Sequence, residues 1–359
     1  MARSRYRKTR SRKLGLPAGT LLHVGEVKTK HPALTLFRYG SDQLFEQSAS
    51  NLAELNLELH PQQTVWLNVH GLQDTGLMAQ IGQLFNLHPL VMEDILHTTQ
   101  RPKLDTYPDY LFVVTRFFNY DAQAMTIDSE QVSLILGRGF VLTFQERPTG
   151  SFDPVRERLR GNRGQIRSAG ADHLAYALLD VVVDRYFIVL EQIGDDCDTL
   201  EEELLRKPGA TMLQGIHKLK RETMELRRAV WPLREVINSL IRNDNNFFHH
   251  DTVLYLRDIY DHTVHFIESL EAIRDLLAGM LDIYLSSISN RVNMEVRALT
   301  VVAMLFMPAT LIAGIFGMNF RVMPWLPEDH GFWFALGLMA GIASLMGLIF
   351  WRRQWLSRH

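Results

Sequence analysis

Hydrophobic residues gather in two long uncharged segments near the C-terminal end of the chain. The first, Ala298–Phe320, has 23 residues without a charge, and the second, Gly331–Trp351, has 21. At a rise of 1.5 Å per residue, a helix of either length would cross a hydrocarbon core roughly 30 Å thick. The alternative, two buried core helices, is disfavoured because such helices rarely stay apolar over this length. We therefore predict a two-helix transmembrane hairpin.

One very long helix is predicted to lead into the first of these segments. Between His250 and Phe316 the only glycines and prolines are Gly279, Pro308 and Gly314, and apolar residues recur every three or four positions. A helix of this length cannot cover its apolar stripe alone, so it needs partner helices, most simply copies of itself.

The chain before this helix mixes strand and helix patterns. Segments rich in β-branched and aromatic residues predict strands at Ala33–Tyr39, Thr64–Val69, Tyr110–Phe118, Val132–Leu136 and Phe140–Phe144. Helical spacing of apolar residues predicts helices at Asp74–Leu87, Pro89–His97, Asp172–Leu205 and Thr211–Arg242. Gly137-Arg138-Gly139 is typical of a tight hairpin turn.

The predicted fold is therefore an α+β cytoplasmic domain with a mixed sheet flanked by helices, a very long stalk helix and a transmembrane hairpin. The expected divisions are a basic disordered tail (1–14), the α/β domain (15–165), a long helical hairpin (166–245), the stalk helix (246–297), span 1 (298–320), an outer loop (321–330), span 2 (331–351) and a basic tail (352–359).

Charge refines this picture. Basic residues flank the two spans and are scarce in the loop between them, which predicts that both termini are cytoplasmic and that the protein lies in the cell (inner) membrane. Residues 1–13 carry seven basic side chains and no acid, so the remaining 31 bases face 40 acids. That balance disfavours a nucleic-acid partner. A single cysteine, Cys197, excludes disulfides within the chain and a cysteine-rich zinc site.

One face of the first span is small or weakly polar. It comprises Asn293, Val296, Thr300, Ala303, Met307, Thr310, Gly314 and Gly317. Such a face suits either close helix packing in a bilayer or the lining of a pore, and the spacing alone leaves both open. A single hairpin cannot enclose an aqueous path, so transport would require a symmetric ring of chains.

The end of the first span carries a resemblance to a known family. Gly317-Met318-Asn319, followed by a short acidic loop, a last span and a basic tail, resembles the CorA family of magnesium channels. Further stretches similar to that family are His88–Ile95, Gln100–Lys103, Ser129–Ser133, Phe152–Arg158, Trp231–Glu235 and Leu281–Ser287. One departure is Trp325, which stands where family members usually have a glutamate.

The resemblance implies a funnel-shaped homopentamer whose cargo is hydrated Mg²⁺ or Co²⁺, with Mg²⁺ also acting as a regulator and no organic cofactor. It assigns the selectivity filter to Gly317, Met318 and Asn319. It assigns the pore lining to Asp282, Asn293, Val296, Leu299, Met307 and Thr310. Regulatory metal sites would use Asp94 with Asp258, and Glu93 with Asp180.

Several functions remain open at this point. The main expectation is a passive, membrane-potential-driven Mg²⁺ channel that also passes Co²⁺ or Ni²⁺ and is gated by cytoplasmic Mg²⁺. A zinc transporter on the same scaffold is the nearest alternative, although Met318 favours magnesium. A non-conducting, membrane-anchored cation sensor is the alternative from another class. An enzyme is disfavoured, because no nucleophile–base set and no Gly-x-x-x-x-Gly-Lys-Ser/Thr run occurs. His262 and His265, near Asp258, suit either a transition-metal site or an ordinary helix surface.

Overall fold

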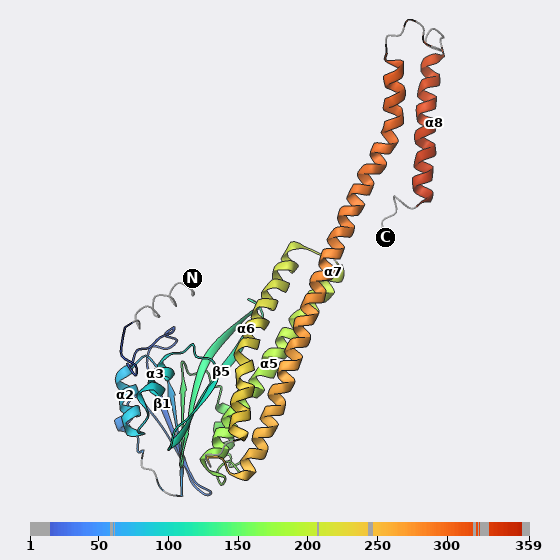
Figure 1. Ribbon diagram of the computed structural model, residues 1–359. Coiled ribbons are helices and arrows are strands. Elements are labelled where there is room, and N and C mark those ends of the chain that lie inside the picture. Colours follow the sequence, from blue (N-terminus) through green and yellow to red (C-terminus); the bar gives the residue numbers. More distant parts are fainter. Residues whose placement is uncertain are drawn as a thin grey trace. The chain divides into compact units, whose positions relative to one another are not determined.

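The computed structural model describes residues 15–57, 60, 62–206, 208–242, 247–318, 321, 323 and 330–353. These residues divide into two compact units. The first contains the described residues up to 203 together with 210–279, and the second contains those in 204–209 and from 280 onward. The helices and strands are labelled in Figure 1.

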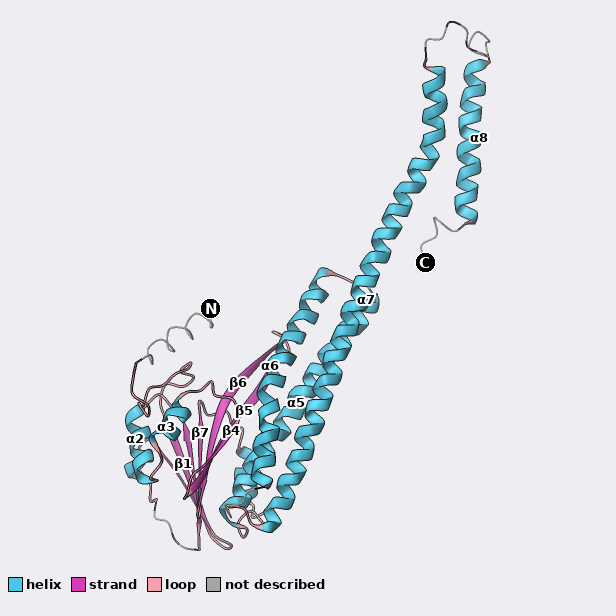
Figure 2. Cartoon of the chain, viewed as in Figure 1, coloured by secondary structure: helices cyan, strands magenta, loops and turns pink. Residues whose placement is uncertain are grey.

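The first unit is built on one mixed sheet (Figure 2). Its order is β2-β1-β3-β7-β6-β5-β4; β3 and β7 pair in parallel, and all other neighbours are antiparallel. The bounds are β1 Ala33–Tyr39, β2 Leu44–Ala49, β3 Thr64–His70, β4 Lys103–Thr106, β5 Tyr110–Asp121, β6 Thr126–Gly137 and β7 Phe140–Gln145. All five predicted strands are confirmed, and the edge strands β2 and β4 are additional.

The predicted hairpin turn joins β6 to β7. Gly137 pairs with Phe140, and Gly139 has a φ of +85°, which only glycine adopts readily. A Cβ on Gly137 would lie 2.1 Å from the Phe140 ring, so this position also depends on the missing side chain.

Helices cover both faces of the sheet (Figure 1). On one face α2 (Thr75–Leu84) and α3 (Pro89–Leu96) pack over a core that includes Leu67, Phe112 and Phe144. On the other face, Phe152 before α4 (Asp153–Arg160) contacts the rings of Trp66 and Phe117. Strand residues therefore alternate between two buried environments, which explains why β3 is buried along its whole length.

Long helices complete the first unit beyond this second face. They are α5 (Gly170–Arg206), α6 (Ala210–Ile241) and the first part of α7 (His250–Phe316), and all three predicted helices are confirmed. Tyr186 on α5 donates a hydrogen bond to the backbone carbonyl of Arg116 on β5 at 2.8 Å and packs against Phe266 on α7. The side chain of Tyr186 thus ties α5 to both the sheet and α7.

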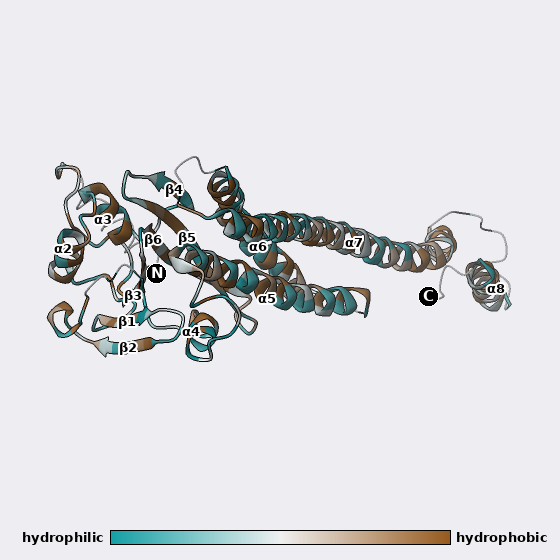
Figure 3. Cartoon of the chain, turned by 90° about the horizontal axis from the view of Figure 1, so that it is seen from below, coloured by the Kyte–Doolittle hydropathy of each residue, from teal (hydrophilic) through white to brown (hydrophobic). Residues whose placement is uncertain are grey.

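The second unit contains the end of α7 and α8 (Gly331–Arg352). Both helices are long and apolar enough to cross a membrane, and only 6% of either apolar segment is buried. The two run antiparallel, and hydrophobic residues line the end of α7 in Figure 3. Apolar helices that hide so little of their surface in the chain itself need another apolar environment.

Candidate ion pathway and divalent-cation sites

The residues predicted to line a pore all lie on α7 and are all exposed. They are Asp282, Asn293, Val296, Leu299, Met307 and Thr310. Gly317 and Met318 follow α7 directly and are exposed as well, whereas Asn319 lies outside the described residues. Leu299 is 71% exposed and Met307 67%, so large apolar side chains on this helix are left uncovered within one chain.

A shallow hollow follows the weakly polar face of α7. It has a volume of about 420 Å³, and its lining is mostly apolar: Ala303, Met307, Thr310 and Gly314 of that face, together with Phe306, Leu311, Ile315 and Met318. The Thr310 hydroxyl donates a hydrogen bond to the Phe306 carbonyl at 2.9 Å. The lone pairs of the Thr310 oxygen can therefore accept a hydrogen bond from water.

Asp94 lies near the C-terminal end of α3, away from the cap at the start of the helix. The helix begins at Pro89, and the ring of His88 accepts a hydrogen bond from the Leu90 backbone N–H at 3.2 Å. Asp94 Oδ1 accepts a hydrogen bond from the Gln100 side chain at 2.5 Å, and Oδ2 lies 2.6 Å from the Lys103 ammonium. Both carboxylate oxygens of Asp94 therefore already have a donor.

Glu93, the neighbouring acid on α3, is held differently. Its Oε2 accepts a hydrogen bond from the backbone N–H of Gly19. Gly19 has a φ of +83°, and its backbone passes directly over Pro89. Glu93 thus holds the N-terminal segment against the start of α3. A metal ion bound at Glu93 would have to share the Glu93 carboxylate with this hydrogen bond.

Asp180 and Asp258 come near one another from α5 and α7. Burial, followed by the charge of Asp184, raises the pKa of Asp180 to about 6, and Asp258 adds to that effect. Burial also raises the pKa of Asp184. On α7, Asp258 Oδ1 lies 3.9 Å from His262 Nε2, and the Asp258 side chain is 62% exposed. The negative charges of these carboxylates repel one another, and a bound cation would reduce that repulsion.

The four predicted metal ligands do not form one site within a chain. Glu93 and Asp94 lie on α3 at one face of the sheet, and Asp180 and Asp258 lie on helices beyond the other face (Figure 1). Across the described ranges, no group of three or more His, Cys, Asp or Glu side chains is placed to hold a metal ion. A site that contains both Asp94 and Asp258 therefore requires a second copy of the chain.

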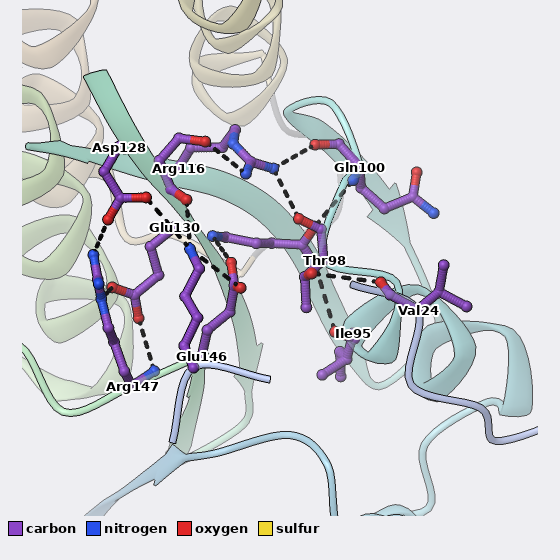
Figure 4. Close-up of polar contacts among 12 residues, drawn as sticks. Val24, Ile95, Thr98, Gln100, Arg116, Asp128, Glu130, Glu146 and Arg147 are labelled. Carbon is purple, nitrogen blue, oxygen red and sulfur yellow. Dashed lines mark hydrogen bonds and ion pairs between the residues drawn. The ribbon is translucent and has the colours of Figure 1, made fainter. Parts of the chain in front are cut away.

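A buried acidic pair, Glu130 and Glu146, is not predicted from the sequence (Figure 4). Glu130 on β6 is fully buried and Glu146 is 5% exposed. Glu130 Oε1 accepts a hydrogen bond from the Arg147 backbone N–H at 3.1 Å, and the Lys28 ammonium lies 3.3 Å from Glu146. Burial raises the pKa of Glu130 to about 7 and also raises the pKa of Glu146.

Hydrogen bonds connect this pair to the end of α3. The backbone N–H of Gln131 donates to Glu146 at 2.8 Å, and the Gln131 side chain donates to the Asp94 carbonyl at 3.2 Å. The Gln131 side-chain oxygen accepts from the backbone N–H of Gln100 at 3.1 Å. Lys28 also belongs to this network. Its ammonium donates a hydrogen bond to the carbonyl of Ser129, which lies 101 residues later in the chain. No local sequence pattern could have indicated that contact.

Similar proteins are known from sequence and from structure. The chain is 43% identical over 346 residues to the cobalt/magnesium transport protein CorA of Thermotoga maritima, covering 96% of this chain and 98% of that protein. It is 25% identical over 305 residues to the divalent cation transporter CmaX of Pseudomonas aeruginosa, covering 84% and 90%. The solved CorA magnesium transporter of Methanocaldococcus jannaschii has the same fold, with a TM-score of 0.76 at 20% identity over 91% of this chain and 99% of that chain.

The match extends over nearly all of the structure described above. A family model described as "CorA-like Mg2+ transporter protein" matches residues 61–353, which include the sheet from β3 onward, the long helices and both apolar helices. Together with the 43% identity to the Thermotoga protein, this match shows that the chain belongs to the CorA-like Mg²⁺ transporter family.

Proposed function

We propose that the chain is a divalent cation channel that lets Mg²⁺, and also Co²⁺ or Ni²⁺, enter the cell passively. The observation that carries the proposal is α7, a single helix from His250 to Phe316 that begins in a folded α+β unit and ends in an exposed apolar span. That span has a weakly polar face and leads directly into Gly317 and Met318. The proposed location is the cell (inner) membrane with both termini in the cytoplasm, in keeping with the basic residues that flank the spans.

The channel is proposed to be a homopentamer. One hairpin per chain leaves no room for an aqueous path, so several copies of α7 must surround a common axis. The exposed Leu299 and Met307 side chains, and the hollow beside Thr310, suit a face that copies of α7 share. The number five follows from the family resemblance rather than from any contact within the chain.

Conduction is proposed to pass the ion with much of its water attached. Mg²⁺ dehydrates reluctantly, so neutral oxygen acceptors such as the Asn319 amide and the Thr310 hydroxyl can bind its water shell without trapping the ion. The membrane potential supplies about 4.6 kcal/mol per 100 mV for a divalent ion, so no nucleotide is needed.

Control is proposed to reside in Mg²⁺ bound between neighbouring copies. Asp94 of one copy and Asp258 of the next would be bridged by the ion and would repel one another without it. Asp94 and Asp258 lie on elements beyond opposite faces of one chain's sheet, and the side chain of each is partly exposed. These positions favour a site between chains. Glu93 and Asp180 are proposed as a second such site.

Flux into liposomes tests the conducting function. The purified protein is reconstituted, a potential negative inside is imposed, and Mg²⁺ entry is followed with an enclosed fluorescent indicator, with Co²⁺, Ni²⁺ and Zn²⁺ in parallel. We expect Mg²⁺ entry that rises with the potential and stops when the potential is removed. Mg²⁺ entry no faster than in empty liposomes would favour the non-conducting sensor, and entry of Zn²⁺ alone would favour the zinc transporter.

A further inference from the structure

Lys103 lies between two carboxylates, one of which is a proposed metal ligand. Its ammonium is 2.6 Å from Asp94 Oδ2 and also donates a hydrogen bond to Asp105. Lys103 begins the edge strand β4, where it pairs with Val114, and Asp105 is two residues further along the same strand. Side chains two residues apart in a strand point to the same side, so Asp105 is a built-in second acceptor for this ammonium.

The surroundings of Lys103 limit where its ammonium can go. The ammonium lies 5.4 Å from the centre of the Phe112 ring, and the side chain is only 31% exposed. Gln100, a neutral side chain, holds the other oxygen of Asp94 and does not oppose a second cation. Lys103 is therefore the positively charged group that a cation arriving at Asp94 meets directly.

We propose that Lys103 is an internal competitor for the divalent ion at Asp94, and that Asp105 receives its ammonium when the ion binds. This inference rests on the proposed regulatory site at Asp94. A Mg²⁺ ion on either carboxylate oxygen of Asp94 would lie close to an ammonium on Oδ2 and would be repelled by it, so binding of the ion favours movement of Lys103 away from Asp94. Because Asp105 keeps the ammonium paired after that displacement, the exchange costs less than leaving Lys103 without a partner.

The consequence is a raised threshold concentration for Mg²⁺. The ion pair with Lys103 stabilises the metal-free arrangement of Asp94, so more Mg²⁺ is needed to fill the site. Removing the ammonium should therefore lower the threshold, and removing Asp105 should raise it, because Lys103 then has Asp94 as its remaining carboxylate partner. Two neighbouring substitutions are thus expected to act in opposite directions.

The test uses the full-length protein and the Mg²⁺ concentration that gives half-maximal protection from a protease. We expect Lys103→Met to lower this midpoint about 1.5- to fivefold, the range for losing one partly exposed ion pair. Lys103→Arg should stay close to the parent, and Asp105→Asn should raise the midpoint. Lys30→Met and Asp109→Asn, which change the same charges at exposed positions without contact to Asp94, serve as matched controls.

A double variant separates competition from a structural role. In an Asp94→Asn background the effect of Lys103→Met should vanish, whereas a merely structural contribution of Lys103 would persist. A Lys103→Met midpoint equal to or above that of the parent overturns the inference, provided that Asp94→Asn itself shifts the midpoint. If Asp94→Asn has no effect, the regulatory site is wrong and the role of Lys103 is rejected with it.

Discussion

The carboxylate of Asp172 accepts a hydrogen bond from the backbone N–H of His249 at 3.0 Å, at the point where α7 begins. The same oxygen accepts from the Thr252 hydroxyl at 2.7 Å, and Asp172 is only 3% exposed. The first backbone amides of a helix have no partner within the helix, so an acidic side chain from α5 here both caps α7 and fixes its direction. Within the first unit, this buried carboxylate thus ties the start of α7 to α5.

Asp172→Ala should loosen this attachment. It leaves the His249 amide and the Thr252 hydroxyl without their acceptor, and we expect a loss of about 1–3 kcal/mol in stability. The measurement is the thermal unfolding midpoint of the purified protein, with Asp251→Ala, an exposed acid in the first turn of α7, as the matched control. An unfolding midpoint equal to that of the control would show that Asp172 is not needed to cap the helix.

Glu130 predicts a pH dependence of stability. Its pKa is raised from 4.5 to about 7 in the folded chain, so the folded state binds more protons than the unfolded state between those values. The contribution of Glu130 to stability is therefore largest below about pH 4.5 and is lost as pH rises to about 7. Glu146, whose pKa is also raised, contributes with the same sign.

Glu130→Gln should flatten this profile. The amide keeps an oxygen for the Arg147 backbone N–H but carries no charge to be desolvated. We expect the unfolding midpoint of the variant to fall less than that of the parent as pH rises from about 4.5 to about 7. Glu157→Gln, an exposed change on α4, is the control, and identical slopes in parent and Glu130→Gln would contradict the assignment.

The helices were more predictable than the polar contacts. The single long helix predicted from about His250 to Phe316 is confirmed, because uninterrupted apolar spacing is a local property of the sequence. The edge strands β2 and β4 were missed because neither has a continuous buried face: β2 has only exposed and half-buried residues, and β4 contains Lys103 and Asp105. Edge strands are often polar, and this removes the hydrophobic pattern that predicts a strand.

The chemistry around Asp94 could be predicted only in part. The resemblance indicated Asp94 as a ligand, but the ion pair with Lys103, nine residues further along, and the buried Glu130 depend on how α3, β4 and β6 pack. Lys28 and Glu146, for example, are brought together by the packing of the N-terminal segment against the end of β7. Such contacts have no fixed sequence spacing, so they follow from the fold and not from a motif.

The proposed assembly makes a direct prediction about mass. Native mass spectrometry of the protein in mild detergent should give five copies, because several copies of α7 must surround a pore and the family resemblance sets their number at five. Val296→Asp, which places a charge on the face that copies of α7 would share, should reduce the fraction of the largest species. Only monomers or dimers for the parent under mild conditions would refute the pentamer.

Asn319 is expected to control conduction and not folding. Asn319→Ala removes the amide that would bind the hydrated ion, and we expect Mg²⁺ entry into liposomes to fall about tenfold or more. The variant should elute at the same size as the parent. Asn290→Ala, at an exposed asparagine on α7 before the span, should conduct normally. Parent-like flux through Asn319→Ala would mean that the selectivity ring lies elsewhere.

Asp94 and Asp258 together are expected to set the inhibition by Mg²⁺. Without the ion, carboxylates of neighbouring copies repel one another; with it, they are bridged, and only a higher affinity of the closed state can shift the population. The double change Asp94→Asn and Asp258→Asn should therefore move protease protection to higher Mg²⁺ concentration, and flux should continue at Mg²⁺ levels that close the parent. Asp261→Asn, three residues further along α7, is the control for charge loss on this helix. If the double variant keeps the parent's protection and closure, the sensor must be sought at Glu93 and Asp180, where the raised pKa of about 6 for Asp180 already marks a carboxylate that a cation would stabilise.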